Sequence, residues 1–229
     1  MNFDGILLID KEKGWSSFDV VAKARNILRS EYRQLHGQDK KIKVGHTGTL
    51  DPLATGLMVV VVGSYCKRAG EFSKLDKVYE AQMKLGETST TGDEEGGKSR
   101  VSEKVPTKNE LKEVLHGFLG ESMQTPPSFS AIKVGGERAY KLAREGREVK
   151  IEPRKVNILS IELISYEYPF ANFIVRVSSG TYIRSLVKDI GKALDTGAYM
   201  SELRRTKVGM YSIENSVLAD NVVSNDIIK

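Results

Sequence analysis

The feature of this sequence that most constrains its fold is a run of six apolar residues, Leu57 to Val62, bounded by Gly56 and Gly63. The run is too short for a typical helix, and four of its residues are the β-branched Val, so it predicts a strand. Because no polar residue interrupts it, the strand must be covered on both faces. The chain therefore folds around a central sheet with other elements packed on it.

The other hydrophobic patterns mix strands and helices without a regular β-α-β repeat. We expect strands at residues 5–10, 79–85, 156–164 and 173–178, and helices at residues 17–29, 107–119, 138–145 and 181–194. Ser16 and Thr107 have the capping-box spacing to Asp19 and Glu110. Polar residues 30–43 predict a loop or a frayed helix extension, and residues 89–105 predict a loop. This order indicates the α+β class, with a mixed, largely antiparallel sheet flanked by helices.

Composition narrows the functional classes. The 229 residues include 35 Lys+Arg and 30 Asp+Glu, a net charge of +5, which agrees with a polyanionic partner and equally with a solvated surface. The single cysteine excludes an internal disulfide and a cysteine-based zinc site, and the three histidines lack metal-ligand spacing. The sequence shows no signal peptide and no apolar run near the ~18 residues of a membrane span. We expect a cytoplasmic protein that needs no metal and contacts no membrane.

The most unusual segment is Gly45 to Gly56, in which three glycines and a proline prescribe a shaped loop that enters the central strand. A loop anchored on a buried strand can hold one side chain rigidly, and the carboxylate here is Asp51. The segment lacks the ending of a P-loop and the spacing of a dinucleotide fingerprint. From the residues alone, Asp51 is either a catalytic carboxylate or an ordinary Asp-Pro turn residue. A hydrolase built on His46 and Asp51 has no nucleophile-elbow motif to support it.

Seven blocks in the chain resemble, in order, motifs of the TruB family of pseudouridine synthases. The resemblance covers about residues 4–211, and the blocks are Gly14-Trp15-Ser16-Ser17, residues 43–56, Asp76-Lys77-Val78-Tyr79, Thr90-Thr91-Gly92-Asp93, residues 124–134, residues 179–184 and Leu203-Arg204-Arg205. It implies that family's catalytic fold, with an active-site cleft across the sheet. The implied reaction converts uridine to pseudouridine in the T-loop of tRNA (position 55), on a flipped-out base and without a cofactor.

The resemblance also implies roles for single residues. Asp51 matches the nucleophile, Arg184 the arginine that pairs with it, and Tyr182 a tyrosine that contacts the base and removes the C5 proton. Tyr79 matches the tyrosine that stacks on the uracil and Leu203 an apolar wall of its pocket. His46 matches a histidine that holds the rearranged T-loop, and four further residues match RNA-contacting or loop-positioning residues: Asp93, Lys133, Arg204 and Arg205. Lys40, Lys41 and Lys43 are expected to add phosphate contacts.

The resemblance predicts a catalytic domain at residues 1–213 and a short tail at 214–229, forming one strand or helix. The tail is too short for the C-terminal RNA-binding (PUA-like) domain of many relatives, which argues against a guide-RNA-dependent enzyme, and a monomer is expected. Two departures are Glu12, where the family usually has proline, and the long segment 30–43. The alternative function is a tRNA-binding folding helper whose catalysis is secondary.

Overall fold

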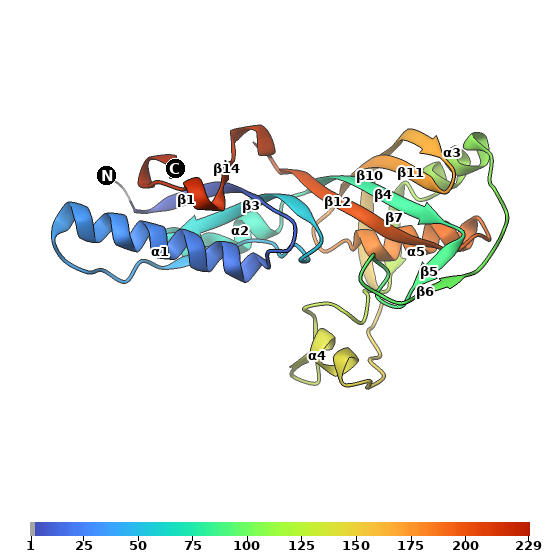
Figure 1. Cartoon of the computed structure of the whole chain (residues 1–229), viewed down its shortest axis with the longest axis horizontal. Coiled ribbons are helices and arrows are strands. Elements are labelled where there is room, and N and C mark those ends of the chain that lie inside the picture. The colour runs from blue at the N-terminus through green and yellow to red at the C-terminus, as the bar shows by residue number, and fades with distance from the viewer. Residues whose placement is uncertain (1–2) are drawn as a thin grey trace. The chain divides into compact units, whose positions relative to one another are not determined.

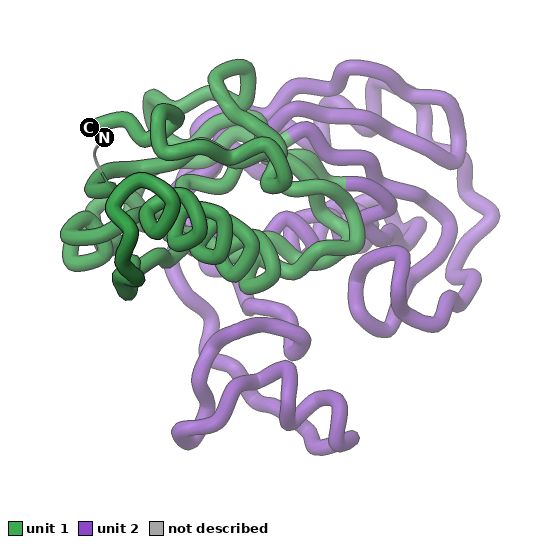
Figure 2. The backbone as a smooth tube through the Cα atoms, turned by 60° about the vertical axis from the view of Figure 1, so that its left-hand side comes forward, with its two compact units in different colours: residues 1–79, 203–229 green, residues 80–202 purple. Residues whose placement is uncertain are grey.

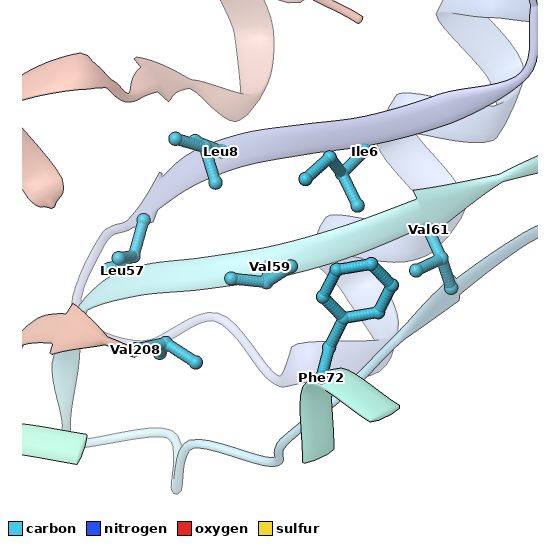
Figure 3. Close-up of a cluster of buried hydrophobic side chains, with 7 residues drawn as sticks. All are labelled: Ile6, Leu8, Leu57, Val59, Val61, Phe72 and Val208. Carbon is cyan, nitrogen blue, oxygen red and sulfur yellow. The ribbon is translucent and has the colours of Figure 1, made fainter. Parts of the chain in front are cut away.

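The apolar run forms strand β3 (Thr55–Val62) in the computed structural model, which describes residues 3–229. Every residue of β3 after Thr55 is buried. Alternate side chains point to opposite faces, and those of one face lie in an apolar cluster (Figure 3) made of Ile6, Leu8, Leu57, Val59, Val61, Phe72 and Val208. The intervening Met58 and Val60 are fully buried on the other face. The predicted coverage of both faces is confirmed.

The backbone divides into two compact units (Figure 2). Unit 1 runs to residue 79 and resumes at residues 203–229, and unit 2 consists of residues 80–202. The chain passes from one unit to the other within β4 (Lys77–Leu85) and returns within β12 (Ala198–Val208). This division differs from the predicted boundary after residue 213, and the assignment of residues 1–213 as the catalytic domain stays a prediction.

Unit 1 is built on strands in the order β14-β1-β3-β12. Strand β1 (Gly5–Lys11) is antiparallel to β3, and β3 is parallel to β12, with Arg205 opposite Gly56. Strand β2 pairs antiparallel with β3, and helix α1 lies alongside these strands (Figure 1). The remaining elements of unit 1 are β2 (Val44–His46), η1 (Gly63–Arg68), α2 (Ala69–Ser73), β13 (Tyr211–Ser212), η2 (Ile213–Asn215), β14 (Val217–Leu218), η3 (Ala219–Asn221) and η4 (Ser224–Asp226).

Helix α1 (Ser17–His36) begins as predicted, because Ser16 and Asp19 form both bonds of a capping box. Its predicted end near residue 29 is wrong, and the helix continues for two more turns. Tyr32 stacks on His36 with ring centroids 4.1 Å apart, and Gly37 ends the helix in the left-handed conformation with φ 67°. The helical alternative for the first part of residues 30–43 is therefore the one observed.

Unit 2 contains strands in the order β12-β4-β11-β10-β7, with β10 antiparallel to both β11 and β7. The segment that carries α4 stands away from this sheet (Figures 1 and 2). The elements are β5 (Glu87–Ser89), β6 (Lys98–Arg100), α3 (Lys108–Gly117), β7 (Gly120–Gln124), β8 (Lys133–Val134), β9 (Glu137–Arg138), α4 (Ala139–Arg144), β10 (Arg154–Glu167), β11 (Phe170–Val177) and α5 (Ile183–Ala193).

The predicted α+β class, a large mixed sheet flanked by helices, is confirmed. Two details were not foreseen: the polar stretch 89–105 contains half of the β5–β6 hairpin, and β12 is a long strand. The tail 214–229 forms β14, which pairs with β1, and 3-10 turns. None of the helices in residues 3–229 is both long and apolar enough to cross a bilayer.

Candidate active site

The loop that carries Asp51 is fixed by hydrogen bonds on both sides of that residue. Ser17 Oγ donates to the carbonyl of Leu50 (3.0 Å) and accepts from its N–H (2.8 Å). On the other side, the N–H of Gly14 donates to the carbonyl of Pro52 (2.8 Å). The Asp51 carbonyl accepts from the N–H of Ala54 (3.0 Å). The backbone of this half-buried carboxylate is therefore held by the start of α1 and by the β1–α1 turn.

Lys11 is a further support of this loop. It ends β1, its side chain is fully buried, and its Nζ donates to the carbonyls of Trp15 (2.7 Å), Glu12 (3.0 Å) and Pro52 (3.2 Å). Burial lowers the pKa of Lys11 to about 8, while the negative charge of Asp51 partly offsets this. One ammonium thus joins the turn after β1 to the residue after Asp51.

Arg205 supports the same loop from β12. Its side chain is 2% exposed, Nε donates to the Leu57 carbonyl (2.7 Å) and Nη2 donates to the Gly48 carbonyl (3.1 Å). Gly56 is required where β3 meets β12, since φ is +106° and a Cβ there would lie 2.3 Å from the Arg205 carbonyl oxygen. These contacts are those of a loop-positioning residue, one of the two roles considered for Arg205.

His46 lies at the end of β2, opposite Val60 of β3. Burial, followed by the positive charge of Arg205, lowers its pKa, so the imidazole is neutral at pH 7. Its Nδ1 is buried and has no hydrogen-bond partner within residues 3–229. A neutral imidazole with a spare ring nitrogen suits a hydrogen bond to an added partner.

Three other predicted residues of unit 1 lie where the chain passes between the units. Tyr79 is 8% exposed and is the last residue of unit 1 before the crossing, and the half-buried Leu203 is the first after it. Arg204 forms an ion pair with Asp10 (2.7 Å) and donates to Thr55 Oγ1 (3.3 Å). The guanidinium of Arg204 thereby contacts β1 and the start of β3.

In unit 2, two predicted residues meet in a buried ion pair. Arg184, in the first turn of α5, lies 3.4 Å from Asp93, and the two side chains are 5% and 8% exposed. Arg184 also donates to the carbonyls of Thr91 (3.0 Å) and Phe129 (2.7 Å). Asp93 accepts from the N–H of Glu95 (3.1 Å) and from the Thr91 hydroxyl. The guanidinium is thus held on three sides within unit 2, and the predicted Asp51–Arg184 pair stays a prediction.

Tyr182 is the N-cap of α5, and its backbone is clamped by Gln124. The buried Gln124 amide accepts from the Tyr182 N–H (2.8 Å) and donates to the Tyr182 carbonyl (3.1 Å). The guanidinium of Arg154 lies 5.1 Å from the centroid of the Tyr182 ring, within the range of a cation–π contact. Gln124 therefore holds the backbone of Tyr182, and Arg154 contacts its ring.

Lys133 lies apart from this group, on the exposed β8–β9 hairpin, where it pairs with Arg138. The cleft across the sheet that the resemblance implies stays a prediction. In the described part of the chain, no group of three His, Cys, Asp or Glu side chains is placed to hold a metal ion.

Four residues that support the site were not predicted from the sequence: Lys11, Ser17, Gln124 and Arg154. Each of them has a partner that is distant in the sequence, as with Gln124 and Tyr182 at a separation of 58 residues and Lys11 and Pro52 at 41. No local sequence pattern predicts that a lysine or a glutamine side chain is buried. The one weak indication of a supporting role was location in the sequence, because Ser17 and Gln124 both lie within motif blocks of the resemblance.

The comparisons with known proteins agree with this fold, and they place the chain among pseudouridylate synthases. The model of the "TruB family pseudouridylate synthase (N terminal domain)" matches residues 33–183, and that of the "tRNA pseudouridylate synthase B C-terminal domain" matches residues 184–226. The chain belongs to the TruB family.

Relatives are similar over nearly the whole chain. Two proteins named tRNA pseudouridine synthase B, from Clostridium kluyveri and Aquifex aeolicus, are each 41% identical to it. The alignments cover 99% and 97% of this chain and 74% and 75% of those proteins.

Solved structures share the fold over about half of their own length. The crystal structure of a Cbf5-Nop10-Gar1 complex contains a chain that matches with a TM-score of 0.67 and 30% identity, over 94% of this chain and 52% of that one. A structure of an H/ACA RNP bound to a substrate RNA containing 2′-deoxyuridine matches with a TM-score of 0.63 and 28% identity, over 93% and 50%. The expected pseudouridine synthase fold is confirmed.

Proposed function

We propose that this protein isomerises uridine to pseudouridine at position 55, in the T-loop of tRNA. The observation that carries the proposal is the position of Asp51: its loop is pinned from both sides by Ser17, Gly14 and Lys11, so one carboxylate is held in a fixed place. The 41% identity to proteins named tRNA pseudouridine synthase B supports tRNA as the substrate.

In the proposed reaction Asp51 acts as the nucleophile while the C1′–N1 bond of the uridine breaks. The bond that its carboxylate forms to the nucleotide is broken again when C1′ joins C5, which restores the free carboxylate. A carboxylate with a reference pKa near 3.9 is ionised at neutral pH and needs no separate base. The uracil then turns, C1′ joins C5, and the C5 proton leaves while N1 gains one. The atoms balance within the nucleotide, so the reaction consumes no cofactor and no water.

Other residues have proposed roles around this step. Arg184 pairs with Asp51 and keeps the carboxylate ionised, and Tyr182 takes the C5 proton. Tyr79 stacks on the extruded uracil, which contributes about 1–3 kcal/mol toward the few kcal/mol that base extrusion costs. Leu203 is an apolar wall of the uracil pocket.

His46 contacts the rearranged T-loop, and its buried, unpartnered Nδ1 supports this role. Asp93, Lys133, Arg204 and Arg205 position loops or contact RNA. The protein acts as a cytoplasmic monomer without a guide RNA.

The test follows tritium released into water from an unmodified tRNA transcript labelled at C5 of its uridines. About one equivalent is expected, because pseudouridine formation must remove that hydrogen, and Asp51→Ala should abolish the release. A transcript with cytidine at position 55 should also give none. If the wild-type protein binds the tRNA but releases no tritium, the synthase proposal is overturned and the folding-helper alternative is favoured.

A further inference from the structure

Unit 1 contains a basic cavity that the proposed reaction does not use. Its volume is about 600 Å³, and it lies between α1 and the segment that leads into β2. Its lining is mainly apolar, with contributions from Ile42, Val44 and Cys66, and four cationic residues lie along its wall: Arg25, Arg29, Lys41 and Lys43. We propose that this cavity binds the phosphodiester backbone of the tRNA, as a second contact remote from Asp51. The inference rests on the proposed function.

The cations of the cavity are mostly unneutralised. Arg29 pairs with Asp39 through two hydrogen bonds. Arg25, Lys41 and Lys43 form no ion pair with any residue of the described chain 3–229. These charges are open to an incoming anion, and phosphate oxygens are natural partners of guanidinium and ammonium groups.

A second hollow extends the basic surface along α1. It has a volume of about 290 Å³ and is lined by Asn26, Arg29, Ser30, Arg33 and Asp39. Arg25, Arg29 and Arg33 are spaced four residues apart, so they form a row on one helix face with steps of about 6 Å. A row of cations beside a hollow follows a chain of phosphates better than it fits one small anion.

The cavity and Asp51 lie at opposite ends of β3. Val44 of the cavity pairs with Val62, whereas Lys11, whose ammonium reaches Pro52 beside Asp51, pairs with Gly56. Six register positions of a strand span about 20 Å. One nucleotide cannot reach both places, so the cavity contacts tRNA residues other than the target uridine. Because phosphate contacts carry no base identity, this contact adds affinity and orientation without changing which uridine reacts.

The test compares two triple variants that each remove three positive charges. The cavity variant is Arg25→Gln with Lys41→Gln and Lys43→Gln. The matched control is Lys104→Gln with Lys108→Gln and Lys112→Gln, on exposed residues before and on α3 of unit 2. Binding of an unmodified tRNA transcript to each protein is measured between 50 and 200 mM salt, and tritium release is measured at saturating tRNA.

Three lost phosphate contacts reduce the slope of log K against log salt by about 2–3. Over the fourfold rise in salt, the affinity of the cavity variant should therefore fall about 16- to 64-fold less than that of the wild-type protein. Its Kd at the lowest salt should rise, and tritium release at saturating tRNA verifies that the variant still acts on bound tRNA. The exposed pair Lys41→Glu with Lys43→Glu repeats the test without touching the half-buried Arg25. Thermal unfolding verifies that each variant is folded.

The inference is overturned if the cavity variants change the slope no more than the control does. It is also overturned if they weaken binding of inorganic polyphosphate but leave tRNA binding intact, since the cavity would then serve another polyanion. Wild-type protein that binds tRNA without tritium release would instead contradict the proposed reaction, so the two failures are distinguishable.

Discussion

Lys11 makes the stability of this protein depend on pH in a way that one substitution can isolate. Its ammonium is fully buried and donates to three carbonyls, and burial lowers its pKa to about 8. In the unfolded chain a lysine titrates near 10.4. Between these pKa values the unfolded chain binds more protons than the folded protein, so raising the pH stabilises the fold.

The size of the effect follows from the two pKa values. Between pH 7 and pH 9 the folded protein loses nearly the whole Lys11 proton while the unfolded chain keeps it, which adds about 1.3 kcal/mol to the free energy of unfolding. For a chain of this length that corresponds to a rise of about 3–5 °C in Tm. Lys11→Met removes this gain. It also leaves three carbonyls without their donor, which costs about 1–3 kcal/mol at pH 7.

The assay is urea unfolding of the wild-type and Lys11→Met proteins at pH 7, 8 and 9. Lys77 also has a pKa lowered to about 8 by burial, but it is present in both proteins, so its contribution cancels in the difference. The stability difference between wild type and variant should widen by about 1.3 kcal/mol from pH 7 to pH 9. A constant difference, or one that narrows with pH, would refute the assignment of Lys11 as a buried ammonium.

Two further substitutions probe the loops. Asp93→Ala should destabilise unit 2 by about 3–5 kcal/mol, because it breaks a buried ion pair with Arg184; urea unfolding measures this, and a loss below about 1 kcal/mol would contradict the geometry. Gly56→Ala should prevent folding or cost more than about 3 kcal/mol, because its Cβ would lie 2.3 Å from the Arg205 carbonyl oxygen at φ +106°. Gly70→Ala, with open space around the Cβ, is the matched control, and equal circular dichroism and unfolding curves for the two variants would count against the close approach.

Local sequence patterns predicted those helices and strands that depend on interactions between residues close in the sequence. The capping boxes at Ser16 and Thr107 place the starts of α1 and α3 to the residue, because each box satisfies backbone donors within one turn. The unbroken apolar run predicted β3 for a similar reason. The end of α1 was missed because it depends on the Tyr32–His36 stack and on Gly37, which follow a polar stretch without clear periodicity.

Strand β12 was not predicted because two of its residues, Arg204 and Arg205, bind residues that are distant in the sequence. Arg204 binds Asp10 and Arg205 binds the carbonyls of Gly48 and Leu57, and in every case the partner is at least 148 residues away. A buried arginine in a strand breaks the expected alternation of apolar and polar residues. Motif order alone supplied the site residues as a set, and their roles stay predictions. The contacts that hold these residues could not be predicted from motif order.

The contacts that hold Asp51 and those that would hold the RNA respond differently to salt. The loop around Asp51 is fixed by hydrogen bonds of buried groups, Ser17, Lys11 and Arg205, which mobile ions screen little. The basic cavity at the other end of β3 acts through exposed charges, whose phosphate contacts weaken as salt displaces them. Raising the salt from 50 to 200 mM should therefore increase the KM for tRNA by at least tenfold while kcat changes less than about twofold. A parallel fall in kcat would mean that the geometry of Asp51 itself depends on exposed charge, and the hydrogen-bonded loop would not be sufficient to hold it.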